Sequence, residues 1–268
     1  MNLKHRLFPT DRRVRAIFGG ETLADSPAAW MGVGGYRPPI YELGTWWFDR
    51  RDVRRDLLEA SEHRAVCEVR GPATYWHVVT DARHGENLAY AYADAPDGWE
   101  DLRNLITFRW NDIDHWYEEN EEVFVHPRGP NHRVDVCRSS RHLQISLDGV
   151  ALADTRRPLA LFETGMPTRW YLPRADVALE RLTPTTTRTQ CPYKGIAEYY
   201  AVDIGDGAIA DLAWTYTFPV TPCRRIEQHI CFFSERIDMT TDAVPQPRPV
   251  TKWEHAIPAR DLVRTTVS

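Results

Sequence analysis

The chain lacks the features that mark several large classes of protein. It has five cysteines among 268 residues, and no two of them form a C-x-x-C pair. That usage suits a reducing cytosol better than a disulfide framework, and it provides no paired zinc knuckle. We therefore expect a cytoplasmic protein without a metal ion or other cofactor.

Long apolar runs and basic blocks are also missing. No run approaches the length that spans a bilayer, and no apolar h-region follows the basic residues near the N-terminus. The formal net charge is -5, and arginine is spread through the chain without a Lys/Arg block. We expect neither nucleic acid nor membrane as a partner, because nothing supplies the electrostatic footprint that either requires.

What the chain does contain is an internal repeat. "CEVRG" at 67–71 and "CPYKG" at 191–195 are 124 residues apart, and the same offset relates many other positions. Nearer the start the offset becomes 129, which aligns 19–26 with 148–155, so the first copy holds five extra residues, 129 minus 124. The Gly and Pro content of 31–39 marks the place of this insertion. A period this long indicates a domain duplication. Further pairs at the shorter offset are Trp46 and Trp170, Tyr75 and Tyr199, Tyr92 and Tyr216, and Phe108 and Phe232.

The repeat predicts two similar domains. We place the first at 12–126, a turn-rich linker at 127–138, the second at 139–241 and a C-terminal tail at 242–268. In the tail, Trp253 and Ile257 are the residues expected to attach it to a domain surface.

Local patterns predict a mostly β fold with minor α content, built from antiparallel hairpins. Residues 142–154 alternate apolar and polar around Asp148-Gly149, and 198–216 repeat this arrangement around 205–207. Short helices are expected within 50–60, 173–182 and 112–123, the last of which has no counterpart helix in the second copy.

The order of motifs in the second copy resembles a known family. "LFETGMPTRWYLPRADV", "CPYKGIAEYYAV", "DLAWTY" and a β segment ending in "RID" are similar to domain-of-unknown-function family 427, which is also labelled a nucleotidyltransferase family. The resemblance covers nearly all of the second copy and, more loosely, the first. It implies two tandem homologous domains of β-tent-like architecture.

The resemblance does not imply nucleotidyl transfer here. That chemistry needs carboxylates that hold Mg²⁺ and a glycine-rich or basic phosphate cradle, and the chain has no such constellation. The copies also differ, because the first has Glu68, Val69 and Arg70 where the second has Pro192, Tyr193 and Lys194. We hypothesise that the second copy kept a site and the first kept part of its structural support.

The pentapeptide "CPYKG" holds the first candidate site residues. Pro192 fixes its own φ, and Gly195 permits a turn closed to other residues, so the segment presents Cys191, Tyr193 and Lys194. Lys194 is a point charge for an anion, a desolvated amine for imine chemistry or a surface cation. Cys191 is a nucleophile or a small buried hydrophobe. His229 is the nearest base in sequence, although a structural role fits it better.

Aromatic and charged residues complete the predicted site. Tyr199, Trp214 and Tyr216 are either core or the walls of a pocket. Glu163 and Arg169 supply an acid or base and an anion clamp, or they pair with each other.

Two functional hypotheses follow. In the first, the second domain binds and chemically transforms a small anionic or carbonyl-bearing metabolite, with Lys194, Glu163 and Cys191 as its reactive groups. In the alternative, a non-catalytic module binds a metabolite or a protein in the cleft between domains, where Arg70 and Tyr75 matter as much as Lys194. The duplication favours a monomer with internal pseudo-twofold symmetry, and a homodimer stays open.

Overall fold

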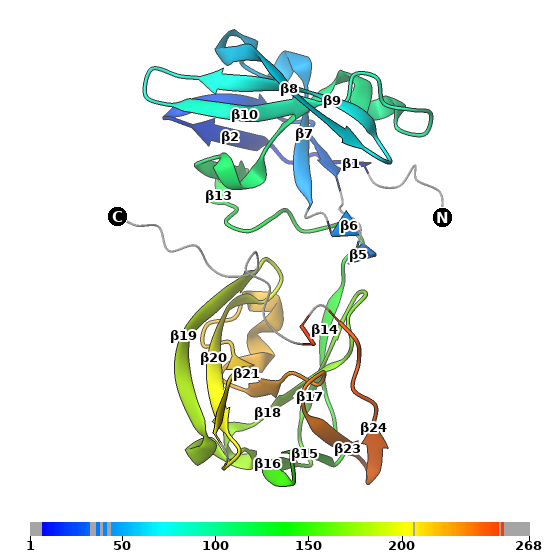
Figure 1. The fold of residues 1–268 in the computed structure, drawn as a ribbon, viewed down its shortest axis with the longest axis vertical. Coiled ribbons are helices and arrows are strands. Elements are labelled where there is room, and N and C mark those ends of the chain that lie inside the picture. Colours follow the sequence, from blue (N-terminus) through cyan, green and yellow to red (C-terminus); the bar gives the residue numbers. More distant parts are fainter. Residues whose placement is uncertain are drawn as a thin grey trace. The chain divides into compact units, whose positions relative to one another are not determined.

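Two units with the same strand order make up the chain. The structure, a computed structural model, describes residues 7–32, 36–37, 40–41, 44–205, 207–251 and 253–254. The first unit comprises Met1–Pro130 and the second Asn131–Ser268 (Figure 1). Strands of the first unit are β1 (Leu7–Pro9), β2 (Val14–Phe18), β3 (Glu21–Ser26), β4 (Trp30–Gly32), β5 (Tyr36–Arg37), β6 (Ile40–Tyr41), β7 (Thr45–Asp49), β8 (Leu58–Cys67), β9 (Gly71–Val79), β10 (His84–Ala91), β11 (Leu105–Phe108), β12 (His115–Glu118) and β13 (Glu121–Glu122).

The second unit repeats this set without counterparts of β5 and β6 among its described residues. Its strands are β14 (Val134–Arg138), β15 (Leu143–Leu147), β16 (Val150–Thr155), β17 (Leu159–Glu163), β18 (Arg169–Leu172), β19 (Leu182–Cys191), β20 (Gly195–Asp203), β21 (Ala208–Thr215), β22 (Ile230–Phe232), β23 (Asp238–Thr241) and β24 (Val244–Gln246). Short 3-10 helices are η2 (Arg50–Asp52), η3 (Arg55–Leu57), η4 (Glu100–Asn104) and η5 (Trp110–Asp112) in the first unit, and η6 (Arg174–Asp176), η7 (Leu179–Arg181) and η8 (Thr221–Ile226) in the second.

Each unit contains a seven-stranded and a four-stranded antiparallel sheet. The large sheets have the orders β1-β4-β7-β11-β10-β9-β8 and β14-β17-β18-β22-β21-β20-β19. The small sheets have the orders β13-β12-β2-β3 and β24-β23-β15-β16. Every strand in the two sheets of the first unit has its counterpart at the same place in the two sheets of the second unit. The predicted mostly β fold and tandem duplication are therefore confirmed.

The duplication extends to individual hydrogen bonds. Ser26 Oγ donates to Asp52 at 2.6 Å, and Thr155 Oγ1 donates to Asp176 at 2.7 Å. The small sheets also share an irregularity, since the register shifts after Ala16 in one and after Ile145 in the other, 129 residues later. Such details depend on single side chains, so they show that the sequence offsets align equivalent positions.

The predicted hairpins form as the turn residues require. Asp148 and Gly149 have φ values of 49° and 80° between β15 and β16, the positive values that an Asp-Gly hairpin turn favours. In the first unit the insertion lies in the connection from β4 to β7, which also contains the β5-β6 hairpin.

The helix predicted within 112–123 is wrong, because residues 115–122 form the hairpin of β12 and β13. Trp116 is buried against the core with its neighbours on the opposite side, a period of two, and Glu119 has a φ of 54° in the turn. The second copy keeps the corresponding hairpin as β23 and β24, so it has not lost this element. The other two helix predictions correspond to pairs of 3-10 turns, η2 with η3 and η6 with η7, each followed by a long strand.

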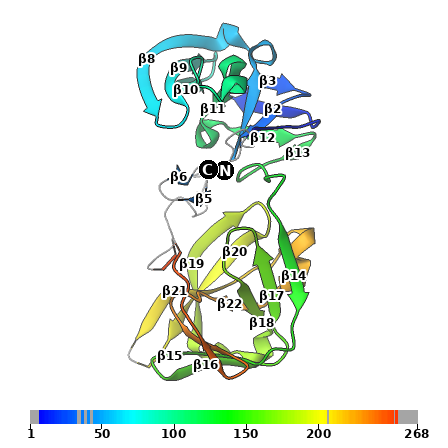
Figure 2. The ribbon, with the colours of Figure 1, turned by 90° about the vertical axis from the view of Figure 1, so that its right-hand side faces the viewer.

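Residues at the predicted linker and tail are partly structured. β14 lies within the expected linker, and it pairs along its whole length with β17 as the edge strand of the second unit's large sheet (Figure 2). β24 lies within the expected tail, and Trp253 packs against a hydrophobic cluster of the second unit. Ile257 lies outside the described residues.

The core of the second unit has two parts, one on each face of the large sheet. Leu152, Val202 and Leu212 are fully buried between the large and small sheets. On the opposite face, under η8, lies a second cluster rich in aromatic residues. This second face carries the candidate site. Among the described residues, no helix combines the length and apolar character needed to cross a membrane.

Candidate functional site

The pentapeptide 191–195 forms the hairpin turn between β19 and β20. Cys191 pairs with Gly195 across the strands, and the three residues between them make the turn. Gly195 has a φ of 107°, and a Cβ there would lie 3.2 Å from the carbonyl oxygen of Phe218. The Val220 N–H donates to the Lys194 carbonyl at 3.0 Å. The segment after β21 therefore holds the turn, and both constraints make glycine the suitable residue at 195.

Lys194 turns its side chain inward to a carboxylate and an imidazole. Its Nζ donates a hydrogen bond to Oε2 of Glu163, the last residue of β17. The other oxygen of Glu163, Oε1, lies 3.1 Å from Nε2 of His132. The three side chains are 12%, 9% and 10% exposed, in the order Lys194, Glu163 and His132. We call these three residues the Lys194 cluster.

Both members of the ion pair stay charged. Burial alone would raise the pKa of Glu163, but the Lys194 ammonium and the hydrogen bond with His132 outweigh it and lower the pKa to about 2. Burial would lower the pKa of Lys194, but the nearby Cys191 and Glu163 outweigh it and raise that pKa. The amine is thus held as ammonium, which disfavours the imine role considered for Lys194, and the carboxylate is a weak base.

His132 and Tyr193 form one wall of the cluster. Their rings stack with centroids 4.1 Å apart and planes 25° from parallel. The backbone carbonyl of Tyr193 also accepts a contact from Cys223 Sγ at 3.3 Å. Sequence reasoning missed His132, because the residue lies in a turn-rich segment that reads as a linker. The signal that could have found it is its position two residues before the apolar alternation of β14.

Arg169 belongs to a different buried pair. Its two terminal nitrogens donate to the two carboxylate oxygens of Glu235, both at 2.6 Å, and Arg169 also donates to Ser234 at 2.9 Å. The considered pairing of Glu163 with Arg169 is therefore wrong. Each instead has its own partner, since Glu163 binds Lys194 and Arg169 binds Glu235. Sequence reasoning did not single out Glu235, although it lies within the β-rich stretch 228–237.

Aromatic rings surround the Arg169 guanidinium. The rings of Trp214, Phe233 and Trp253 lie 5.6, 5.8 and 5.7 Å from it. Thr251, just before Trp253, donates to Glu235 at 2.6 Å. The first part of the C-terminal segment is thus attached to the second unit by a hydrogen bond and an aromatic contact.

The predicted aromatic residues gather on one face. Tyr199 and Trp214 pair across β20 and β21, and Tyr216 lies near them in the same buried cluster. Tyr171, which the sequence did not single out, joins them by accepting a hydrogen bond from Trp214 Nε1 at 3.2 Å. Burial raises the pKa of Tyr171 and Tyr216 well above the ordinary value, so both phenols are neutral. Trp214 lies beside the Arg169 guanidinium, and Tyr171 and Tyr216 are near enough to Lys194 and Glu163 to interact with their charges.

Cys191 is half-buried at the end of β19. Within the described part of the chain, no hydrogen bond joins it to a histidine that could act as its general base. His229 binds the backbone carbonyl of Glu227 at 2.9 Å, in keeping with a structural role. The role of Cys191 as the reactive group stays a prediction that the geometry does not favour.

The first unit builds a different arrangement at the equivalent turn. Arg70 takes the place of Lys194, and its guanidinium lies 5.7 Å from the ring of Tyr92 and 5.4 Å from that of Trp99. Tyr75 stacks on Tyr90 at 5.5 Å. The first unit therefore packs its cation against aromatic rings at this point.

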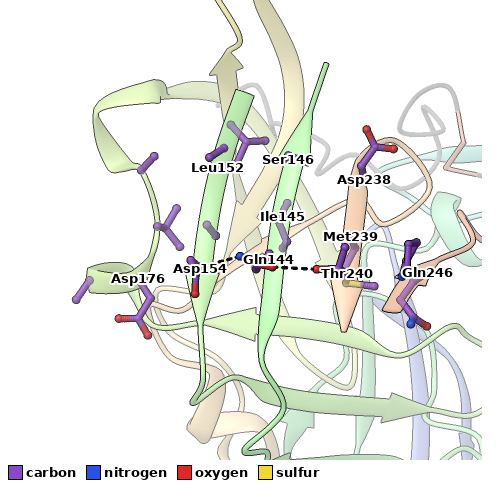
Figure 3. Close-up of a pocket in the computed structure, with 16 residues that line it drawn as sticks. Gln144, Ile145, Ser146, Leu152, Asp154, Asp176, Asp238, Met239, Thr240 and Gln246 are labelled. Atoms are coloured by element: carbon purple, nitrogen blue, oxygen red, sulfur yellow. Dashed lines mark hydrogen bonds between the residues drawn. The ribbon is translucent and has the colours of Figure 1, made fainter. Parts of the chain in front are cut away.

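A separate groove of about 780 Å³ lies on the small sheet of the second unit (Figure 3). Gln144 on β15 crosses its floor, donating to Asp154 at 3.0 Å and accepting from Thr240 at 3.4 Å. The three carboxylates in its lining are paired, Asp154 with His142 and Asp238 with Arg248, both at 2.7 Å, and Asp176 with Arg157 at 2.8 Å. The predicted site residues do not line this groove.

Comparison with known proteins identifies a family without an activity. A family model described as "Domain of unknown function (DUF427)" matches the chain twice, over residues 6–119 and 135–243. No curated protein matches the chain. Among the described residues, no group of three or more His, Cys, Asp and Glu side chains is placed to hold a metal ion.

Proposed function

Because the chain belongs to the DUF427 family, as two tandem copies, and the family's description states no ligand, we propose a function from the site alone. The second unit binds a small anionic or carbonyl-bearing metabolite at the Lys194 cluster. Lys194 offers the hydrogen-bond donor, and Tyr193 with the neighbouring aromatic face provides flat apolar surface.

One observation carries the proposal, namely a buried ion pair with a histidine in one copy of a duplicated fold. A buried ion pair is weak evidence for stability, because well-packed apolar residues often serve the fold equally well. The first unit reaches the same strand order with Arg70 at this turn. The offset of 129 residues holds from Leu7 to Gly32, and extending it by a few residues at either end places Gly34 and Leu3 opposite Glu163 and His132; they carry neither a carboxylate nor an imidazole. Retention of all three groups in the second copy therefore indicates a use beyond folding.

The chemistry that these groups support is hydrogen bonding and proton transfer. The Lys194 ammonium can polarise a carbonyl group, and His132, held by Glu163, can carry a proton. Nucleotidyl transfer is not part of the proposal, because Glu163 is the carboxylate at this cluster and both of its oxygens are occupied by Lys194 and His132. The proposal includes a cytoplasmic monomer, supported by five free cysteines and by the internal duplication.

A thermal-shift screen of metabolites tests this function. We compare wild type with a Glu163→Leu/Lys194→Met double variant, because a single change at Lys194 would leave Glu163 buried without its ammonium partner. A ligand at about 100 times its Kd stabilises the folded state by about 2.7 kcal/mol. We expect such a stabilisation in wild type and in an Arg70→Met control, and none in the double variant. Equal stabilisation of all three proteins would refute the site.

The groove of Figure 3 supports a second candidate function, non-catalytic binding. The carboxylates that line the groove are in ion pairs, so its other polar groups are amides and hydroxyls, such as those of Gln144 and Thr240. Such groups suit an uncharged ligand with several hydrogen-bonding groups. A ligand whose stabilising effect is lost in Gln144→Ala but kept in the double variant would favour this function over the first.

A further inference from the structure

We propose that Glu163 determines the charge of the ligand: by neutralising Lys194, it makes the second unit select a neutral carbonyl compound over an anion. This inference rests on the proposed function and narrows its ligand class. It concerns a specificity-determining role for Glu163, which the sequence presented as a candidate acid or base or as a partner of Arg169.

The contact between Lys194 and Glu163 is the first step of the argument. The two charged groups are hydrogen-bonded, so any group that approaches the ammonium also approaches the carboxylate. An anion at this place is attracted by one charge and repelled by the other at similar distances, and the two effects nearly cancel. A neutral carbonyl oxygen meets no such repulsion, and it can accept one of the ammonium N–H donors that Glu163 leaves.

The compensation is permanent in the neutral pH range. The pKa of Glu163 is lowered to about 2 and that of Lys194 is raised, so neither group loses its charge near neutrality. Neither residue alone is therefore available as a free ion. His132 contacts the same carboxylate through its other oxygen.

The second cation near this face is compensated as well. Arg169 makes a two-point contact with Glu235, whose side chain is fully buried. A bidentate arginine–carboxylate pair in a buried place leaves no excess positive charge to attract an anion. The anion clamp of Lys194 and Arg169 expected from the sequence thus loses its electrostatic basis, since each cation already holds a carboxylate.

The surrounding groups add polarity without charge. Tyr171 and Tyr216 are neutral phenols in the same buried face, and Trp214 contributes an indole. Neutral rings beside a hydrogen-bond donor suit a planar, uncharged compound such as an amide, a ketone or an aldehyde.

Matched amide and carboxylate probes test the inference on the full chain. Acetamide with acetate, and benzamide with benzoate, differ within each pair chiefly in charge. Ligand-detected NMR titration measures the Kd of each probe for wild type and for the Glu163→Gln variant. We expect wild type to bind an amide about tenfold or more tightly than its carboxylate, and Glu163→Gln to reverse this order, because Lys194 is then uncompensated.

The outcomes separate the two claims. Tighter binding of the carboxylates by wild type, or an unchanged order in Glu163→Gln, would overturn the role of Glu163 while leaving the proposed function intact. Binding of no probe by wild type, or equal binding by the Glu163→Leu/Lys194→Met variant, would overturn both. If Glu163→Gln does not fold, the comparison of the two probe pairs on wild type decides the question alone.

Discussion

At the scale of single residues, the site is defined by the ion pairs that its charged side chains form. Lys194, Glu163 and Arg169 all stand out in the sequence, but their partners do not. Glu163 joins Lys194 from 31 residues away, and Arg169 joins Glu235 from 66 residues away. Pairing at such distances follows from sheet topology, so composition and local pattern could name the charges without assigning them. His132 escaped notice because it lies in a turn-rich segment that has the composition of a linker.

The ion pair predicts an acid-sensitive contribution to stability. The pKa of Glu163 is lowered from 4.5 to about 2, so its contribution is present above about pH 4.5 and is lost as the pH falls toward 2. Between about pH 6 and pH 3, we expect wild type to lose roughly 2 kcal/mol more of its free energy of unfolding than Glu163→Leu/Lys194→Met. Urea titrations at each pH measure this difference. Parallel pH profiles of the two proteins would contradict the assignment.

The effects of substituting Lys194 and Glu163 on the free energy of unfolding should also be strongly non-additive. Lys194→Met leaves the Glu163 carboxylate buried without its ammonium, and we expect a loss of about 3–5 kcal/mol in the free energy of unfolding. Adding Glu163→Leu removes the unpaired charge, so the double variant should recover to within about 2 kcal/mol of wild type. Denaturant unfolding of the three proteins completes the cycle. Additive losses would show that the two side chains act independently.

At the scale of elements, the turn of "CPYKG" explains why two of its residues are shared with the first copy. Gly195 and Gly71 both have positive φ, and each pairs with the cysteine that ends the preceding strand. These positions serve backbone geometry. Lys194 and its equivalent Arg70 occupy the same turn but reach different neighbours. The turn therefore presents a cation in both units, and the rest of each unit decides what it meets.

Substitution of Gly195 should lower the free energy of unfolding more than substitution of another glycine with positive φ. Gly195→Ala strains the backbone and places a Cβ 3.2 Å from the Phe218 carbonyl, whereas Gly149 has nothing within 4 Å of the same position. We expect losses of about 2–3 kcal/mol for Gly195→Ala and about 1 kcal/mol for Gly149→Ala. Thermal or urea unfolding measures both. Similar losses would mean that the contact with the segment after β21 adds no constraint.

Strand pairing was the part of the fold that the sequence could predict best. Asp148-Gly149 determines its hairpin locally, and the repeat offsets transfer every assignment from one copy to the other. The acidic segment at 112–123 was misread as a helix because its charges hide the period of two around Trp116. Propensity is a weak prior where a single buried side chain and pairing with β2 decide the conformation.

At the scale of the whole molecule, duplication supplies an internal comparison. Each unit has its own buried clusters, so the fold itself does not need the Lys194 cluster. The second unit has diverged at a turn and at an edge of one sheet, and there it carries a carboxylate and an imidazole, of Glu163 and His132, that its counterpart lacks in sequence. Specialisation of one copy is the simplest account of this difference.

Two units with separate cores should unfold in two steps. Calorimetry of the full chain is expected to show two transitions, with Gly195→Ala lowering the midpoint of one and Phe48→Ala, in the core of the first unit, lowering the midpoint of the other. Phe48→Ala should lower the free energy of unfolding of the first unit by about 3–5 kcal/mol. A single transition that both variants shift equally would show that the units unfold together.

The claim that the Lys194 cluster is a binding site for a small carbonyl-bearing or anionic compound can be tested in one comparison. Saturation-transfer NMR is recorded for acetamide, benzamide and their carboxylates with full-length wild type and with Glu163→Leu/Lys194→Met, whose fold is verified by circular dichroism. We predict transfer to at least one probe in wild type and none in the folded double variant. Equal transfer in both proteins, or none in wild type, would contradict the assignment of this site.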